Sequence, residues 1–208
     1  MTNNDFLNYW DYFLYIDKDL KNTNRYLQHT ERNLNAFSSE FARIILVACA
    51  EIDTICRLLC KEIQSDCDFP DATTRSGDIA EYGRIILSRF PLLATTEVYF
   101  TTLQANKKPW DGWMISPNFK SPKWWKDYQL IKHYRHNNFD KATLENALYA
   151  VSSLYIMLMY LNKTAFGFTK DINTDDPDCF YSRAIFDYDE SQLGDNYTIK
   201  QLPDFSTS

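Results

Sequence analysis

Glycine, histidine and the common catalytic motifs are scarce in this chain. Only five glycines occur in 208 residues, and the patterns of a P-loop, G-x-G-x-x-G, H-E-x-x-H and G-x-S-x-G are all absent. These motifs place phosphate-binding backbone, zinc ligands or a nucleophilic serine, so nucleotide-cradling and catalytic-triad chemistry are not expected. The three histidines, His29, His133 and His136, have too few acidic neighbours in the sequence to predict a metal site. We therefore expect no metal and no cofactor.

The five cysteines contain no C-x-x-C pair, and their odd number fits poorly with a secreted disulfide framework. Cys49, Cys56 and Cys60 share one face of a predicted helix, at spacings of seven and four. This spacing favours buried small hydrophobic residues over a redox role.

Long apolar runs and a targeting signal are also missing. No run approaches the roughly 18 residues that a membrane-spanning helix needs, and no cationic region precedes an apolar one at the N-terminus. We therefore expect a cytoplasmic protein without membrane contact. The net charge of −6 opposes a generally basic surface, but a local basic cleft remains compatible with it.

The apolar and aromatic content, 45% and 16%, predicts one well-packed and mainly α-helical domain. We assign residues 1–167 to a helical bundle and 168–208, which are acidic and turn-rich, to an irregular C-terminal extension. That extension is expected either to pack as an appendage or to be partly mobile. Helices are predicted over 4–21, from a cap at Ser39 to about Gln64, and over 78–90; short extended segments are predicted near 25–28 and over 95–103.

The longest helical pattern lies between Pro122 and Leu161, where two helices joined by a polar turn are predicted. The second helix is expected to begin at an N-cap Asp140 and to end at Gly167. In the first helix, Trp124, Tyr128, Ile131 and Arg135 fall on one stripe. Arg135 must therefore either extend from the helix end or meet a buried acid.

The only stretch of the chain in which histidines and cations cluster together lies in this first helix. A histidine with a pKa near ~6.5 can exchange protons with an RNA 2′-hydroxyl or leaving oxygen, and lysine or arginine can stabilise charge on phosphate. The alternative is a polar helix face in which His133 only hydrogen-bonds a neighbouring helix, and periodicity alone favours that alternative. The cluster consists of Tyr128, Gln129, Lys132, His133, Arg135 and His136.

Glu51 follows the apolar run 44–50 of the predicted central helix. A charged residue in such a place is usually paired, which makes Glu51 a candidate partner for Arg135 or Lys132. Exposure of Glu51 where the helix emerges into solvent is equally compatible with the pattern. The loop Lys107–Trp113 contains two tryptophans, which are expected to cover the core rather than to form an aromatic ligand cage.

The order of segments resembles uncharacterised bacterial proteins of the HEPN-like class. The resemblance covers residues 38–162 and rests on EFARIILVACAEID, YGRIILSRFPLL, PWDGW, WWKDYQLIKHYR and ATLENALYAVSSLYIMLMYL. It implies a helical bundle with a central long helix and at most a minor strand pair, commonly dimeric. Many members of the class are metal-independent ribonucleases of toxin–antitoxin, CRISPR or phage-defence systems. By resemblance His133 would be the catalytic histidine, with Arg135 and Lys132 as phosphate-contacting or structural cations.

The chain departs from the ribonuclease signature of that class, in which an arginine precedes the histidine by four to six residues. Upstream of His133 stand Lys126, Asp127, Tyr128 and Gln129 but no arginine. Either Lys126 or Gln129 substitutes, or the bundle binds without cleaving. The leading hypothesis is a homodimeric RNA-binding protein or endoribonuclease in which the 124–136 helices of two subunits face each other. The alternative is a non-catalytic sensor, antitoxin-like or other interaction module with a protein partner.

Overall fold

The computed structural model describes residues 1–67, 78–167 and 176–181, and within them the protein is mainly helical. This confirms the predicted fold class in its coarse form. The α-helices are α1 (Asn3–Thr23), α2 (Ser39–Ile63), α3 (Ile79–Arg89), α4 (Lys123–Asn138) and α5 (Leu144–Phe166). Three short strands, β1 (Val98–Phe100), β2 (Ala105–Lys107) and β3 (Phe180–Tyr181), and 3₁₀ turns at Glu31–Asn33, Leu93–Thr95 and Phe139–Lys141 complete the described elements.

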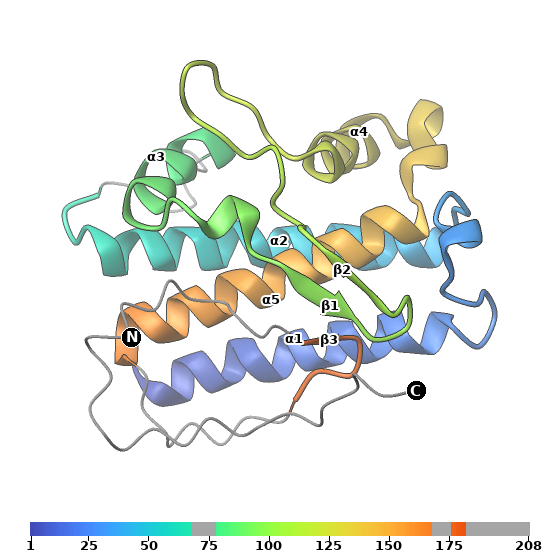
Figure 1. Ribbon diagram of the computed structural model, residues 1–208, viewed down its shortest axis with the longest axis horizontal. Coiled ribbons are helices and arrows are strands. Elements are labelled where there is room, and N and C mark those ends of the chain that lie inside the picture. The colour runs from blue at the N-terminus through green and yellow to red at the C-terminus, as the bar shows by residue number, and fades with distance from the viewer. Residues whose placement is uncertain (68–77, 168–175, 182–208) are drawn as a thin grey trace.

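Helices α2 and α5 form the centre of the bundle and pack along each other (Figure 1). Helix α1 lies on one side of this pair, whereas α3 and α4 lie on the other. The buried side chains of α2 fall on one broad face of the helix, whereas Glu40, Arg43 and Ala50 on the other side are exposed. Its N-cap is Ser38, whose hydroxyl accepts the Phe41 backbone N–H at 3.1 Å. The predicted cap, Ser39, is instead the first helical residue.

Helix α5 is the most apolar element. Its N-cap is Thr143, whose hydroxyl accepts the Asn146 backbone N–H. The prediction of Asp140 as the cap was wrong, because a 3₁₀ turn separates Asp140 from the helix and its carboxylate pairs with Lys141 at 2.8 Å. Gly167 ends the helix as predicted, at a positive φ of 66° that glycine tolerates.

By length and composition α5 is the one helix within the described residues that is apolar enough to cross a membrane. The expectation that no segment reaches this level therefore needs correction. Of its apolar window, 83% is buried inside the protein. Core helices pass the same test, since burial favours apolar residues by itself.

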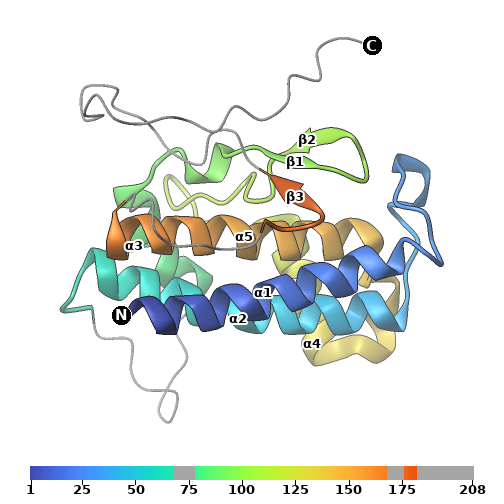
Figure 2. The same ribbon diagram turned by 90° about the horizontal axis from the view of Figure 1, so that it is seen from below.

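The strands form a small antiparallel sheet in the order β2–β1–β3, which adds one strand to the predicted pair. The sheet is seen beside α5 in Figure 2. Strand β3 is anchored to α1 by Asp17, a buried carboxylate that accepts the backbone N–H of Asp178 at 2.6 Å and of Cys179 at 3.2 Å. Residues 176–181 therefore pack on the bundle; residues 168–175 and 182–208 of the predicted extension lie outside the described residues.

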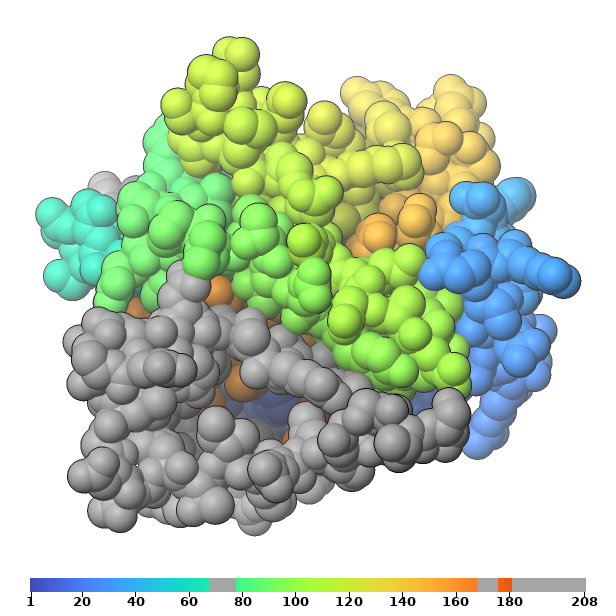
Figure 3. Space-filling view, in the orientation of Figure 1, coloured from blue at the N-terminus to red at the C-terminus, as the bar shows by residue number. Residues whose placement is uncertain are grey.

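The segment after α1 contains no strand near 25–28; turns occupy it and lead to a buried histidine, His29. His29 lies between Thr23 at the end of α1 and Thr102 in the β1–β2 turn, at 2.8 and 3.3 Å. An ion pair of 2.8 Å between Lys107 and Glu31 joins the same two regions. On the face seen in Figure 3, the hairpin and this segment are neighbours.

The tryptophan loop belongs to the core, as predicted. Trp110 and Trp113 are 0% and 2% exposed, and their rings lie 4.6 Å apart. Trp124 of α4 packs edge-on against Trp110 and donates its indole N–H to the Pro109 carbonyl at 2.6 Å. This contact fixes the N-terminal half of α4 on the bundle. Cys49, Cys56 and Cys60 are buried and free, in agreement with the structural role predicted for them.

Candidate functional site

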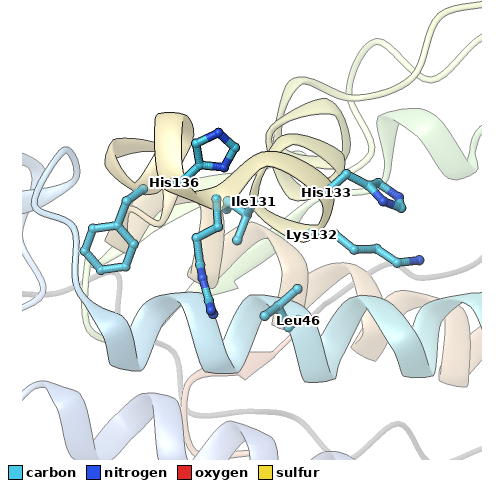
Figure 4. A pocket seen from close by; sticks show the side chains of 7 residues that line it. Leu46, Ile131, Lys132, His133 and His136 are labelled. Carbon is cyan, nitrogen blue, oxygen red and sulfur yellow. The ribbon is translucent and has the colours of Figure 1, made fainter.

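The predicted basic cluster lies along an open hollow of about 570 Å³ between α4 and α2. Ile131 and Leu46 face each other across its apolar floor, and Lys132 extends beside them (Figure 4). The imidazoles of His133 and His136 project from α4 in different directions. The full lining consists of Leu46, Ile131, Lys132, His133, Arg135, His136 and Phe139.

A kink in α4 determines which side chains reach this hollow. Trp124, Tyr128 and Ile131 are buried on one stripe, as the helical wheel predicts. Tyr134 then leaves helical geometry, with φ −137° and ψ 38°, and Arg135 no longer continues the stripe. Arg135 is exposed. Of the two predicted environments for Arg135, the structure therefore gives the exposed helix end and not a buried acid.

The cations of the hollow have no acidic partner among residues 1–67, 78–167 and 176–181. Lys132, His133, Arg135 and His136 are all exposed, and none forms an ion pair with any residue in the described ranges. Lys132 lies over the ring of Tyr128, with Nζ 5.7 Å from its centroid, which is within the usual range of a cation–π contact. Lys132 and Arg135, which have no carboxylate partner in the described part of the chain, form a local positive surface on a chain of net charge −6.

Glu51 does not play the predicted supporting role. Its side chain is half-buried on α2, and desolvation raises the pKa of its carboxyl group. Within the described parts of the chain it forms no ion pair with Arg135 or Lys132. Within the described residues, therefore, no carboxylate compensates the charge of Lys132 and Arg135.

The remaining predicted residues divide by burial. Tyr128 is 5% exposed. Its burial raises the pKa of its phenol, and the nearby Cys49 and Asp53 raise it further. Its ring contacts Lys132, and it is not part of the lining of the hollow. Lys126 is exposed and Gln129 half-buried, and neither lines the hollow.

Two lining residues, Leu46 and Phe139, were not predicted from the sequence. Leu46 belongs to the apolar run of α2, and nothing in the pattern distinguishes its direction from that of its neighbours. Phe139 lies in the 3₁₀ turn after α4 and packs edge-on against Phe37, with ring centroids 5.7 Å apart. The sequence shows Phe37 next to the cap of α2, but its exposure and its contact with Phe139 appear only in the structure.

Chemically the hollow is suited to bind a phosphate chain. Its ammonium and guanidinium groups can contact phosphate oxygens, and its two imidazoles can take part in hydrogen bonds to a ligand. No group of three or more His, Cys, Asp or Glu side chains within the described residues is placed to hold a metal ion. No family model, curated protein or solved structure matches the chain.

Proposed function

We propose that the protein binds RNA along the hollow between α4 and α2 and cleaves it with His133 as proton-transfer group. The observation that carries the proposal is the gathering of Lys132, His133, Arg135 and His136 around one open hollow without an acidic partner among the described residues. Phosphate contacts supply most of the affinity of such a surface.

In the proposed reaction the 2′-oxygen of a ribose attacks the adjacent phosphorus as its proton passes to His133. The bond from phosphorus to the 5′-oxygen breaks, and that oxygen takes up a proton from water, which leaves a 2′,3′-cyclic phosphate and a 5′-hydroxyl. Arg135 and Lys132 stabilise the negative charge that builds on the phosphate oxygens. The reaction requires a 2′-hydroxyl, so DNA of the same sequence would be bound but not cleaved.

The proposal includes a HEPN-like assembly, in which the α4 helices of two subunits face each other. Supporting it are the mainly helical fold and the exposed side of α4, where Tyr134 is 59% exposed beside His133. Sedimentation velocity measures the mass directly. We expect the wild type to be a dimer and Tyr134→Glu to be a monomer. A monomeric wild type would refute this arrangement.

The deciding experiment incubates the purified protein with total cellular RNA in the presence of EDTA. Cleavage by the wild type and its loss in His133→Ala are expected. Lys18→Ala serves as control, because Lys18 is an exposed cation on α1. Cleavage by His133→Ala at the wild-type rate would refute the assignment of His133.

A non-catalytic interaction module is the second candidate, and a specific observation favours it. The imidazole of His133 makes only a ring contact with Tyr134 and has no hydrogen-bond partner in the described part of the chain. A catalytic histidine is usually oriented by such a partner. A wild type that neither cleaves nor binds RNA would favour this function over the first.

A further inference from the structure

A second hollow, of about 280 Å³, lies next to the basic one, at the junction of α4 with the start of α5. Phe139 lines the first hollow, and Phe37, in edge contact with Phe139, lines the second. The volume is near the lower end of the range for ligand pockets. It suits one small planar group better than a large ligand.

The second hollow is built around two polar side chains that are almost completely buried. Asp127 and Asn146 are 6% and 2% exposed, and the Asn146 amide donates to Asp127 Oδ2 at 3.0 Å. Lys123 Nζ donates to the same carboxylate oxygen at 2.7 Å. The Asn146 amide is fixed further by the Lys141 carbonyl, to which it donates at 2.8 Å. These bonds determine which oxygens face an incoming group.

Two acceptor oxygens remain without a donor. Neither Asp127 Oδ1 nor the Asn146 side-chain oxygen accepts a hydrogen bond from any residue in the described ranges. Neither oxygen is among the fully buried side-chain atoms without a partner, so both are open to solvent and can accept from a bound group. The ammonium groups of Lys123 and Lys141, on the lining of the same hollow, each retain further N–H donors. A matching ligand therefore offers two donors beside one acceptor.

Among the four RNA bases only guanine carries this pattern on its Watson–Crick edge, with N1–H and the N2 amino group as donors beside the O6 acceptor. Adenine, cytosine and uracil each offer a single donor position there. Phe37 is 52% exposed on the lining of the hollow, and an exposed ring of this kind can stack on a base.

We infer that the hollow formed by Asp127, Asn146 and Phe37 is a guanine-binding subsite for the RNA strand held by α4. This inference rests on the proposed function and names the base that the site selects. Asp127 and Asn146 accept the two donors of guanine, a lysine donates to O6, and Phe37 stacks on the ring. Recognition of this edge requires an unpaired base, so the substrate is single-stranded at the guanine.

The test measures binding of GMP, AMP, CMP and UMP to the full chain by calorimetry, and of G-containing and G-free oligoribonucleotides by fluorescence anisotropy. GMP is expected to bind at least about tenfold more tightly than the others, since a mismatched buried polar edge is strongly discriminated against. Asp127→Asn, which offers an amide in place of a carboxylate, should abolish this preference. Phe37→Ala, at an exposed position, should weaken GMP binding without risk to folding, and Asp11→Asn on α1 is the matched control.

The outcomes separate the inference from the proposed function. Equal binding of the four nucleotides, an unchanged preference in Asp127→Asn, or displacement of GMP by free arginine at equal concentration would overturn the inference. RNA binding without preference for guanine would overturn it too, but would leave the proposed function standing. Preference for GMP with no affinity for RNA would support the subsite and refute the proposed function.

Discussion

Acidification should destabilise the protein through His29. Burial lowers the pKa of this imidazole to about 4, whereas an unfolded histidine titrates near ~6.5. The hydrogen bonds indicate the neutral form: Thr23 donates its hydroxyl to the Leu20 carbonyl at 2.7 Å, so its oxygen accepts from His29 Nε2. Nδ1 is then left to accept from Thr102.

The sign and size follow from the two pKa values. At a pH between these two values the unfolded chain binds a proton at His29 that the folded protein does not bind. The contribution of His29 to the free energy of unfolding is therefore fully present above pH ~6.5 and decreases as the pH falls toward 4. Each pH unit in this window removes about 1.4 kcal/mol. At pH 5 the free energy of unfolding should therefore be about 2 kcal/mol lower than at neutral pH because of His29 alone.

Urea denaturation followed by tryptophan fluorescence at pH 7.5 and pH 5 measures this loss. The comparison is with His29→Gln, which cannot titrate in this range. Burial raises the pKa of Asp17 and of Glu51, which makes their contributions opposite in sign, but these are common to both proteins and cancel in the difference. An equal loss of stability in wild type and His29→Gln would refute the reasoning.

Three further outcomes test the fold and the basic hollow. Thr143→Ala should lower the free energy of unfolding by about 1 kcal/mol through loss of the N-cap of α5, whereas Asp140→Ala should leave it nearly unchanged; chemical denaturation of both variants checks this. Ile52→Ala removes a fully buried side chain from α2 and should cost about 2–5 kcal/mol by the same assay, and a cost below 1 kcal/mol would contradict the packing described. Replacing Lys132 and Arg135 together by alanine should weaken RNA binding. It should also reduce the slope of log K against log salt by about 1.4, because each phosphate contact to a single strand contributes about 0.7. Anisotropy titrations at several salt concentrations measure the slope, and an unchanged slope would place the phosphate contacts elsewhere.

The sequence by itself determined the helices of this protein, because each carries its apolar pattern and its end signals locally. The buried stripe from Trp124 to Ile131 follows from 3.6-residue periodicity, and Gly167 ends α5 because glycine accepts a positive φ. The tryptophans of the loop before α4 were correctly assigned to the core, since large aromatic side chains gain most from burial. The basic cluster on α4 was visible in the same way.

Only the tertiary structure decided which of these groups meet. The kink at Tyr134 turns Arg135 out to solvent and leaves Glu51 without the predicted partner, and no local pattern encodes such a break. Asp127 reads in the sequence as one more charge on α4, and its pairing with Asn146 appears only when α5 packs beside it. Contacts between residues far apart in the chain depend on how helices pack, and this is why the sequence predicts a basic cluster on α4 but not the geometry around it.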